Sequence, residues 1–303
     1  MRHAWLNGRI IPESDAVVSI YDSAMMYGDS VFEMTRTFNR TRFLNEEHLD
    51  RLERSMARLH LRSIPYRRVD ILNAQDALDR ANAESWASDD EVRELITVAR
   101  GPLPVYRHLK PEPWLMICQY PLRWVLQDAA HRYRAGIAGY TTEWKSLPQD
   151  CVPVYVKHHN RINFRLAEQA VPEGGWAVMQ DQEGFLTEAT GANLFLATHS
   201  ELWTPPIATS LPGISQAFVR TLADTLGIPT RELLFRQPHD APVQEAFFTC
   251  TPWSIVPWTS LNGKPIGDGR PGLITKRLTQ AWIESVGCAF VEQAERWEGK
   301  ETP

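Results

Sequence analysis

Apolar residues change their spacing repeatedly along this chain, and that change of period limits the folds that it can adopt. Residues 31–38 form an extended run of strand-forming residues, and Asn39 and Arg40 turn it into a second short run over 41–44. From Asn45 the spacing becomes helical, and we expect Asn45 to cap this helix. Because strand and helix patterns alternate in both halves, we expect an α+β protein with mixed sheets.

Further elements follow from the same patterns. Asn7 and Gly8 separate two short apolar runs, which predicts a hairpin at the N-terminus. Strands are expected over residues 91–100, 114–120, 176–180, 193–197, 230–235 and 246–250, and helices over 68–83, 158–170, 215–226 and 273–286.

The length of 303 residues suggests about two domains. Between residues 121 and 150 the pattern becomes irregular, and Pro, Gly and Trp become more frequent. We therefore expect a smaller N-terminal α/β domain at 1–120, a linker at 121–132 and a larger C-terminal mixed-sheet domain at 133–303.

Composition and charge exclude several classes of function. The net charge of −5 offers no basic stripe for nucleic acid or for a membrane surface. The chain has no apolar run of about 18 residues and no signal-peptide pattern at its start, so a cytoplasmic protein is expected. The four cysteines lie far apart and predict neither a disulfide scaffold nor a zinc site, so we expect four buried thiols in a reducing cytosol.

Lysine is rare, because only six of the 32 basic residues are lysines. Lys157 follows the apolar run 152–156, where partial burial lowers the pKa of an amine and frees its lone pair for attack on a carbonyl. By itself Lys157 would more readily be interpreted as a surface lysine whose apolar stem is covered. The adjacent His158 and His159 do not predict a metal site, because neighbours on the expected helix point about 100° apart.

Six segments in series carry a more specific signal. They are residues 27–33 (YGDSVFE), 47–52 (EHLDRL), 156–161 (VKHHNR), 184–195 (GFLTEATGANLF), 211–215 (LPGIS) and 248–252 (FTCTP). In this order and spacing the chain resembles the class IV (fold type IV) pyridoxal-phosphate enzymes over nearly its whole length. This family includes branched-chain and D-amino acid aminotransferases, (R)-selective amine transaminases and aminodeoxychorismate lyases.

The resemblance implies a cofactor site for pyridoxal 5′-phosphate. Lys157 matches the lysine that holds the cofactor as a Schiff base, the internal aldimine. Glu188 matches the glutamate that keeps the pyridine nitrogen protonated, and Arg51 matches the phosphate arginine, although alone it would be one charge on a solvated helix. The remaining matches are phosphate contacts at Ile214, Ser215 and Thr251 and a phenolate contact at Arg161.

The resemblance also implies a substrate pocket. Tyr27, Phe32 and Arg36 match a segment that lines the pocket in the aminotransferases. Arg100, Arg107 and His108 match a loop that traps the substrate carboxylate in the D-amino acid enzymes, although the loop is one residue longer here and Arg107 could be a solvated loop residue.

These matches predict an aminotransferase that moves an amino group between an amino acid or primary amine and a 2-keto acid. The motif from Lys157 to Arg161 is closer to the lyase pattern, so an aminodeoxychorismate lyase is the alternative, with a non-catalytic cofactor-binding protein as a remote one. The resemblance implies a homodimer with a shared active site, and small-molecule substrates rather than nucleic acid or membrane.

Overall fold

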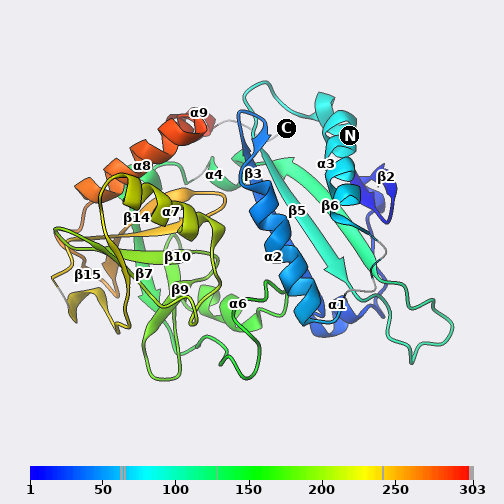
Figure 1. Ribbon diagram of the computed structural model, residues 1–303, viewed down its shortest axis with the longest axis horizontal. Helices are drawn as coiled ribbons and strands as arrows, with labels where there is room; N and C mark the ends of the chain where they lie inside the picture. Colours follow the sequence, from blue (N-terminus) through cyan, green and yellow to red (C-terminus); the bar gives the residue numbers. More distant parts are fainter. Residues whose placement is uncertain (62–63, 65, 128, 241, 300–303) are drawn as a thin grey trace. The chain divides into compact units, whose positions relative to one another are not determined.

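The structure, a computed structural model, describes residues 1–61, 64, 66–127, 129–240 and 242–299. The chain forms two compact units, whose elements are labelled in Figure 1. Unit 1 comprises Met1–Trp124 together with Val156–Arg161, and unit 2 comprises Val125–Tyr155 together with Ile162–Pro303. None of the helices formed by the described residues is long and apolar enough to cross a membrane.

This division differs from the expected one in two respects. The chain leaves unit 1 within the stretch 121–132, but a short helix, α4 (Arg123–Leu126), lies there, and residue 128 is outside the described residues. The segment Val156–Arg161 belongs to unit 1, although it lies within the range 133–303 that we expected to form one C-terminal domain.

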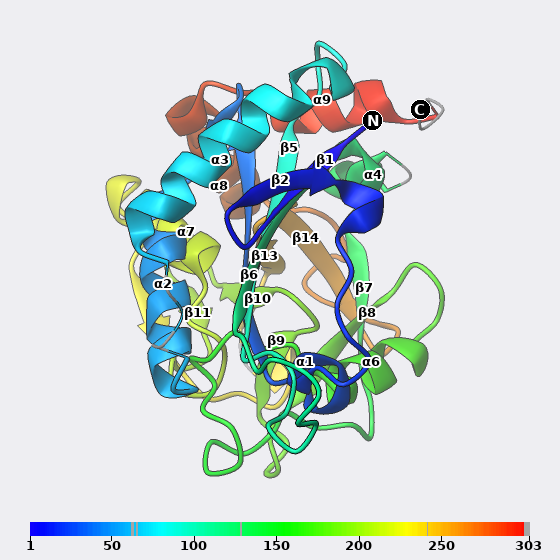
Figure 2. The ribbon, with the colours of Figure 1, turned by 90° about the vertical axis from the view of Figure 1, so that its right-hand side faces the viewer.

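Unit 1 is built on an antiparallel sheet, with α2 (Asn45–Arg58) packed against β3 and α3 (Arg68–Asn82) against β1, β2 and β6, as Figure 2 shows from another side. A short helix, α1 (Ser23–Tyr27), precedes β3. In spatial order the strands are β2 (Arg9–Pro12), β1 (His3–Leu6), β6 (Trp114–Pro121), β5 (Val92–Ala99), β3 (Ser30–Phe38) and β4 (Thr41–Arg42).

Alternation along the strands gives this sheet two different faces. Val31, Ile96 and Val98 are buried in the apolar core beneath the two helices. The residues between them project from the opposite face, because successive side chains of a strand point to opposite sides. We call this the Phe32 face. It carries Phe32, Met34 and Arg36 on β3 and, directly opposite them, Thr97, Leu95 and Arg93 on β5.

The segment Val156–Arg161 pairs with the first half of β3. The amide of Phe32 donates to the carbonyl of Lys157 at 3.0 Å, and the amide of His159 donates to the carbonyl of Ser30 at 3.2 Å. The helix expected over 158–170 therefore begins only at α6 (Ile162–Gln169). Gly28 lies beside this segment with φ +66°, and a Cβ there would lie 2.9 Å from Cα of Asn160.

Unit 2 contains a mixed sheet. The strands β7 and β8, β7 and β14, and β11 and β12 pair in parallel, and the other pairs are antiparallel. In spatial order the strands are β12 (Thr230–Glu232), β11 (Leu202–Thr204), β10 (Asn193–Ala197), β13 (Glu245–Cys250), β14 (Ser254–Leu261), β7 (Ile137–Thr141), β8 (Trp176–Gln180) and β9 (Leu186–Ala189), with β15 (Lys264–Pro265) beside β14.

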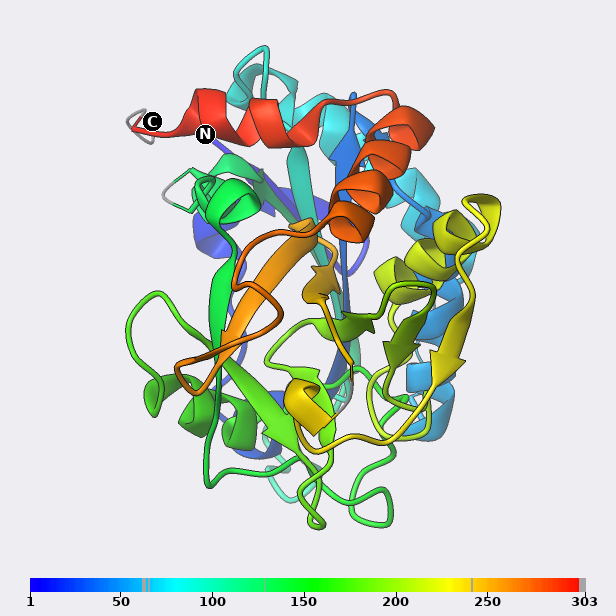
Figure 3. The ribbon, with the colours of Figure 1, turned by 90° about the vertical axis from the view of Figure 1, so that its left-hand side faces the viewer.

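Helices cover this sheet at its centre. The helices α7 (Ile214–Thr225) and α8 (Leu273–Val286) pack on each other and against β13, and α8 also packs against β14 (Figure 3). The helix α5 (Arg132–Ala135) also packs against β14, and α9 (Phe290–Trp297) follows α8 in the chain.

The α+β class with mixed sheet pairing is confirmed, and the predicted elements 176–180, 193–197 and 273–286 have the observed bounds. The capping role of Asn45 is wrong. Leu44 occupies the N-cap position with a left-handed backbone, and Asn45 is the first helical residue, whose side-chain amide donates to Gln75 at 2.9 Å. Cys151 is exposed, so not all four thiols are buried.

Candidate active site

Lys157 is held from two sides within unit 1. Its backbone pairs with Phe32, and its amide donates to Oγ of Ser55 on α2 at 3.1 Å. Its Nζ lies 4.7 Å from the centre of the Phe32 ring. Residues opposite each other in an antiparallel pair share a face, so the Lys157 side chain joins the Phe32 face.

His159 lies on the same face as Lys157. Its ring stacks on Phe32 at 4.2 Å, and its Nδ1 is 2.9 Å from Oγ of the buried Ser30. Desolvation lowers the pKa of His159 to about 4, and the positive charges of Arg161 and Lys157 act in the same direction. His159 is therefore a neutral imidazole that Ser30 orients beside the lysine.

The argument that placed His158 and His159 on a helix is wrong, because both lie in the extended segment. His158 faces away from Lys157, since it forms the isolated bridge with Val31. Within the described ranges, no group of three His, Cys, Asp or Glu residues is arranged to hold a metal ion.

Arg51 is buried on the face of α2 that packs against β3. Its Nε donates to Oε1 of Glu33 at 2.7 Å and its Nη2 to Oε2 at 2.9 Å. Nδ1 of His48 also lies 2.8 Å from Oε2 of Glu33. Burial acts to raise the pKa of Glu33, but the charge and hydrogen bonds of Arg51, together with the hydrogen bond of His48, outweigh it and hold this pKa well below its usual range.

The candidate substrate residues of unit 1 fall into different environments. Phe32 is buried beneath Lys157, and Arg36 is buried on the same face, with its guanidinium 3.8 Å from the Phe38 ring. Tyr27 ends α1 and is exposed. Arg161 is half-buried where the paired segment ends, directly before α6.

The three candidate substrate residues in the loop that follows β5 differ in their environments. Arg107 and His108 are exposed, and the His108 ring contacts Tyr21 at 5.9 Å. Arg100 instead forms a bidentate ion pair with Asp29, at 2.7 and 3.1 Å, and its Nη2 donates to the carbonyl of Leu59 at 2.8 Å. The geometry gives Arg100 a structural role in holding the loop.

Sequence reasoning missed Arg93, Glu33 and His159. Arg93 lies opposite Arg36 on the Phe32 face, 5.5 Å from the Tyr120 ring. An arginine inside the largely apolar strand 92–99 was an available signal. Glu33 and His159 stand inside the quoted motifs, but their importance depends on pairings that link distant parts of the chain.

The predicted cofactor residues of unit 2 lie at strand ends and at a helix start. Glu188 is half-buried on β9, and Thr251 lies in the turn between β13 and β14. Ile214 and Ser215 open α7, whose N-cap is Gly213 and which has no side-chain cap. A helix start without a side-chain cap leaves backbone N–H groups available to an anion.

Two further observations fit a polar ligand in unit 2. The backbone approaches closely at Gly213, where a Cβ would lie 1.9 Å from Oδ1 of Asn193. The buried hydroxyls of Thr190 and Ser254 have no hydrogen-bond partner among the described residues. Thr190 follows β9, which carries Glu188, and Ser254 follows the turn with Thr251. The residues present therefore suit a phosphorylated, polar cofactor.

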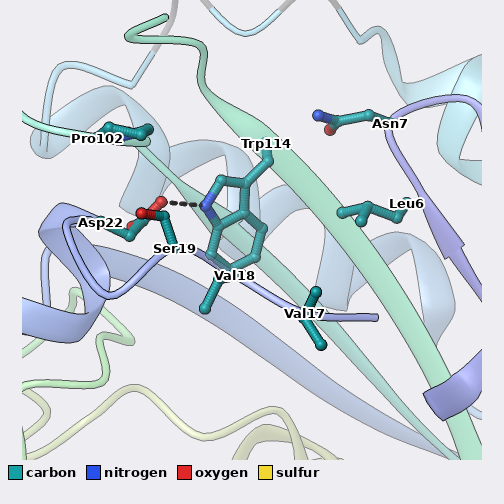
Figure 4. A pocket seen from close by; sticks show the side chains of 8 residues that line it. All are labelled: Leu6, Asn7, Val17, Val18, Ser19, Asp22, Pro102 and Trp114. Carbon is teal, nitrogen blue, oxygen red and sulfur yellow. Dashed lines mark hydrogen bonds between the residues drawn. The ribbon is translucent and has the colours of Figure 1, made fainter. Parts of the chain in front are cut away.

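A cavity of about 170 Å³ in unit 1 is separate from these residues (Figure 4). In Figure 4 the Trp114 ring lies beside the segment that carries Val18, Ser19 and Asp22. Its Nε1 donates to Oδ2 of Asp22 at 2.7 Å. None of the predicted site residues lines this cavity. Its lining consists of Leu6, Asn7, Val17, Val18, Ser19, Asp22, Pro102 and Trp114.

Comparisons with known proteins agree on one family. Residues 30–261 match the family model described as amino-transferase class IV. The chain is 31% identical over 279 residues to a Methanocaldococcus jannaschii protein assigned as a branched-chain-amino-acid aminotransferase, covering 91% of this chain and 93% of that protein. It is 28% identical over 304 residues to the Escherichia coli branched-chain-amino-acid aminotransferase, covering 97% and 95%.

Solved structures give the same result. The crystal structure of the Escherichia coli branched-chain amino acid aminotransferase matches with a TM-score of 0.81 and 26% identity, covering 93% of this chain and 94% of that one. A second crystal structure, the T.th. branched-chain amino acid aminotransferase with pyridoxamine 5′-phosphate, matches with a TM-score of 0.82 and 25% identity, covering 94% of each chain.

Proposed function

Because the chain belongs to the class IV aminotransferase family and is a pyridoxal-phosphate-dependent transaminase, we propose that Lys157 is its catalytic lysine and that its donors are aliphatic amino acids. The observation that carries this proposal is the composition of the Phe32 face around Lys157. There the apolar Phe32, Met34 and Leu95 adjoin the two cations Arg36 and Arg93. An apolar wall beside guanidinium groups suits a substrate with one carboxylate and an aliphatic side chain.

The cofactor, when bound, supplies a ring that accepts the electron pair released when the Cα–H bond of the substrate breaks. Lys157 would bind the cofactor, be released by the incoming amine, and then carry the proton between Cα of the substrate and C4′ of the cofactor as general base and acid. Glu188 would keep the pyridine nitrogen protonated, and Arg161 would contact the phenolic oxygen.

The phosphate would be held by groups of three kinds. Arg51 supplies a cation, the N–H groups at Ile214 and Ser215 supply the start of a helix, and Thr251 supplies a hydroxyl. In the substrate pocket, Arg36 and Arg93 would bind the carboxylate, with Tyr27 and the loop residues Arg107 and His108 at the pocket entrance.

We also infer that the enzyme is a cytoplasmic homodimer. Large apolar side chains are exposed in two neighbouring loops of unit 1, one of which runs into α1: Val17 is 73% exposed, Ile20 71%, Met25 on α1 69% and Val105 72%. These loops touch, since the rings of Tyr21 and Tyr106 lie 4.5 Å apart. Such a patch is typical of a subunit interface, and the four free thiols are compatible with a reducing compartment.

Dimerisation can be tested by light scattering at micromolar concentration. Replacing Ile20 and Met25 together by Asp should give a monomer. Leu273→Asp serves as the matched control, because Leu273 is 75% exposed on α8, outside the two loops. A dimer that survives the double replacement would show that the patch has another role.

The catalytic proposal is tested by borohydride reduction of the purified holoenzyme followed by peptide mapping. The pyridoxyl group should be found on Lys157, and its recovery on another lysine would reject the proposal. A panel of branched-chain L-amino acids, D-amino acids and (R)-amines should then show loss of the cofactor absorbance with the aliphatic amino acids. A 2-keto acid should restore this absorbance, whereas a lyase would release pyruvate without needing an acceptor.

A further inference from the structure

Two buried arginine–glutamate pairs lie on the helix side of the sheet in unit 1. In one, Glu33 on β3 holds Arg51, with side chains 0% and 5% exposed. In the other, Glu94 on β5 holds Arg42, with side chains 2% and 13% exposed. The two pairs differ in their further partners. Glu33 also binds His48, which lies one turn before Arg51 on α2, whereas Glu94 accepts hydrogen bonds from Gln75 and Gln119.

A need for stability does not explain the Glu33 pair. Burying two charges costs about as much free energy as their attraction returns, so apolar residues of similar volume often serve as well. What the pair does provide is a fixed orientation. Nε and Nη2 of Arg51 are both bound to Glu33, at 2.7 and 2.9 Å, which fixes the plane of the guanidinium group.

The bonds to Glu33 run along the Nε–Nη2 edge of the guanidinium. His48 fixes the carboxylate in turn. Burial lowers the pKa of His48, so the imidazole is neutral and can donate a hydrogen bond through Nδ1. One turn after Arg51, Ser55 accepts the amide of Lys157 at 3.1 Å, so α2 holds both Arg51 and the lysine segment.

We propose that Glu33, supported by His48, is a positioning residue that orients Arg51 toward the phosphate of the cofactor. This inference rests on the proposed function, in which Arg51 binds that phosphate. Glu33 acts through Arg51 and does not touch the cofactor itself.

Two effects of Glu33 on phosphate affinity have opposite signs. Its negative charge opposes a phosphate dianion, so its removal would strengthen binding through charge alone. Its hydrogen bonds fix the guanidinium, so its removal would weaken binding. In Glu33→Gln the amide group places a donor opposite a donor of Arg51 or His48, which displaces the guanidinium. The proposal requires that the affinity lost with the orientation of Arg51 exceeds the affinity gained by removing the negative charge.

The test measures how tightly the apoenzyme binds pyridoxamine 5′-phosphate and how tightly it binds pyridoxamine. Neither compound forms a bond to lysine, and the two differ only in the phosphate. Isothermal titration calorimetry measures both dissociation constants. For Glu33→Gln we expect the affinity for pyridoxamine 5′-phosphate to fall about 10-fold or more, the equivalent of one charge-assisted hydrogen bond. The affinity for pyridoxamine should change less than about 2-fold, because orientation of Arg51 matters only for the phosphate.

The matched control is Glu94→Gln, which alters the other buried pair. It should lower the denaturation midpoint of the apoenzyme without changing the ratio of the two affinities. If Glu94→Gln reduces this ratio as strongly as Glu33→Gln does, the effect is a general loosening of the sheet and the positioning role is wrong. If Glu33→Gln leaves the ratio unchanged or increases it, the role is also wrong.

Arg51→Ala separates this inference from the function on which it rests. If Arg51→Ala abolishes the preference for the phosphate while Glu33→Gln retains it, Arg51 keeps its role and only the positioning by Glu33 is rejected. If Arg51→Ala retains the preference, the phosphate role of Arg51 is rejected and the positioning with it. Should Glu33→Gln fail to fold by circular dichroism, His48→Asn provides the same comparison, with an expected loss of a few-fold.

Discussion

Replacing Gly213 by Ala should damage the start of α7 through a single steric contact. The new Cβ would lie 1.9 Å from Oδ1 and 3.0 Å from Cγ of Asn193, a distance at which one of the two groups must move. Asn193 is buried, and its side-chain amide donates to the carbonyl of Leu211 at 2.9 Å, which holds the loop that leads into the helix. The φ of Gly213 is −74°, so the backbone itself tolerates Ala.

The magnitude follows from these contacts. Overpacking of a buried site costs about 1–3 kcal/mol, and loss of the hydrogen bond to Leu211 adds about 1 kcal/mol. We therefore expect Gly213→Ala to lower the free energy of unfolding by about 2–4 kcal/mol. The affinity for pyridoxamine 5′-phosphate should fall as well, because the N–H groups of Ile214 and Ser215 move with the helix start.

Urea unfolding of four proteins measures the contact itself: wild type, Gly213→Ala, Asn193→Ala and the double variant. Removal of the Asn193 side chain removes the clash, so Gly213→Ala should cost at most about 1 kcal/mol in that background, the usual penalty of Ala at an N-cap. An unfolding cost for Gly213→Ala that is the same in both backgrounds would refute the steric explanation.

Three further outcomes are expected. His159 has a folded-state pKa of about 4, below its ordinary value near 6.5. Its contribution to the free energy of unfolding is therefore complete above pH 6.5 and is lost as the pH falls toward 4. His159→Gln should flatten the dependence of this free energy on pH between 4 and 6.5, as measured by urea unfolding. Glu188→Gln should keep bound cofactor but slow the half-reaction with an amino acid, by a few kcal/mol of barrier in stopped-flow absorbance, and an unchanged rate would remove Glu188 from the mechanism. Arg93→Met should raise KM for the keto acid more than it lowers kcat, and steady-state kinetics with an unchanged KM would place the carboxylate elsewhere.

The spacing of apolar residues was sufficient to predict those elements that depend only on their own residues. The buried strands at 176–180 and 193–197 and the amphipathic helix at 273–286 follow from spacing alone. The strand β7 was missed, because its partners β8 and β14 pair with it in parallel from other parts of the chain; β14 was missed although it also pairs antiparallel with its neighbour β13. The helix predicted from His158 was four residues too early, because pairing with β3, more than a hundred residues away, holds residues 157–159 extended.

The candidate site divides in the same way. Lys157 could be selected from the scarcity of lysine and the apolar run before it, and Arg51 and Glu188 from their place in a series of motifs. Arg93 was visible as an arginine inside a largely apolar strand, but its place opposite Arg36 depends on a register that only the folded sheet defines. Arg100 was expected in the pocket, but an aspartate at position 29 engages it in an ion pair that no spacing rule reveals.

The return of Val156–Arg161 to unit 1 has a consequence for the order of events during synthesis. The first 124 residues contain every strand of the unit 1 sheet, yet they lack the segment that pairs with the first half of β3. That part of β3 keeps unpaired backbone groups until residue 161 has left the ribosome, after more than half of the 303 residues have been made. A fragment that ends at residue 124 should therefore have an unpaired strand edge and aggregate through it. Supplying residues 156–161 as a separate peptide should reduce this aggregation.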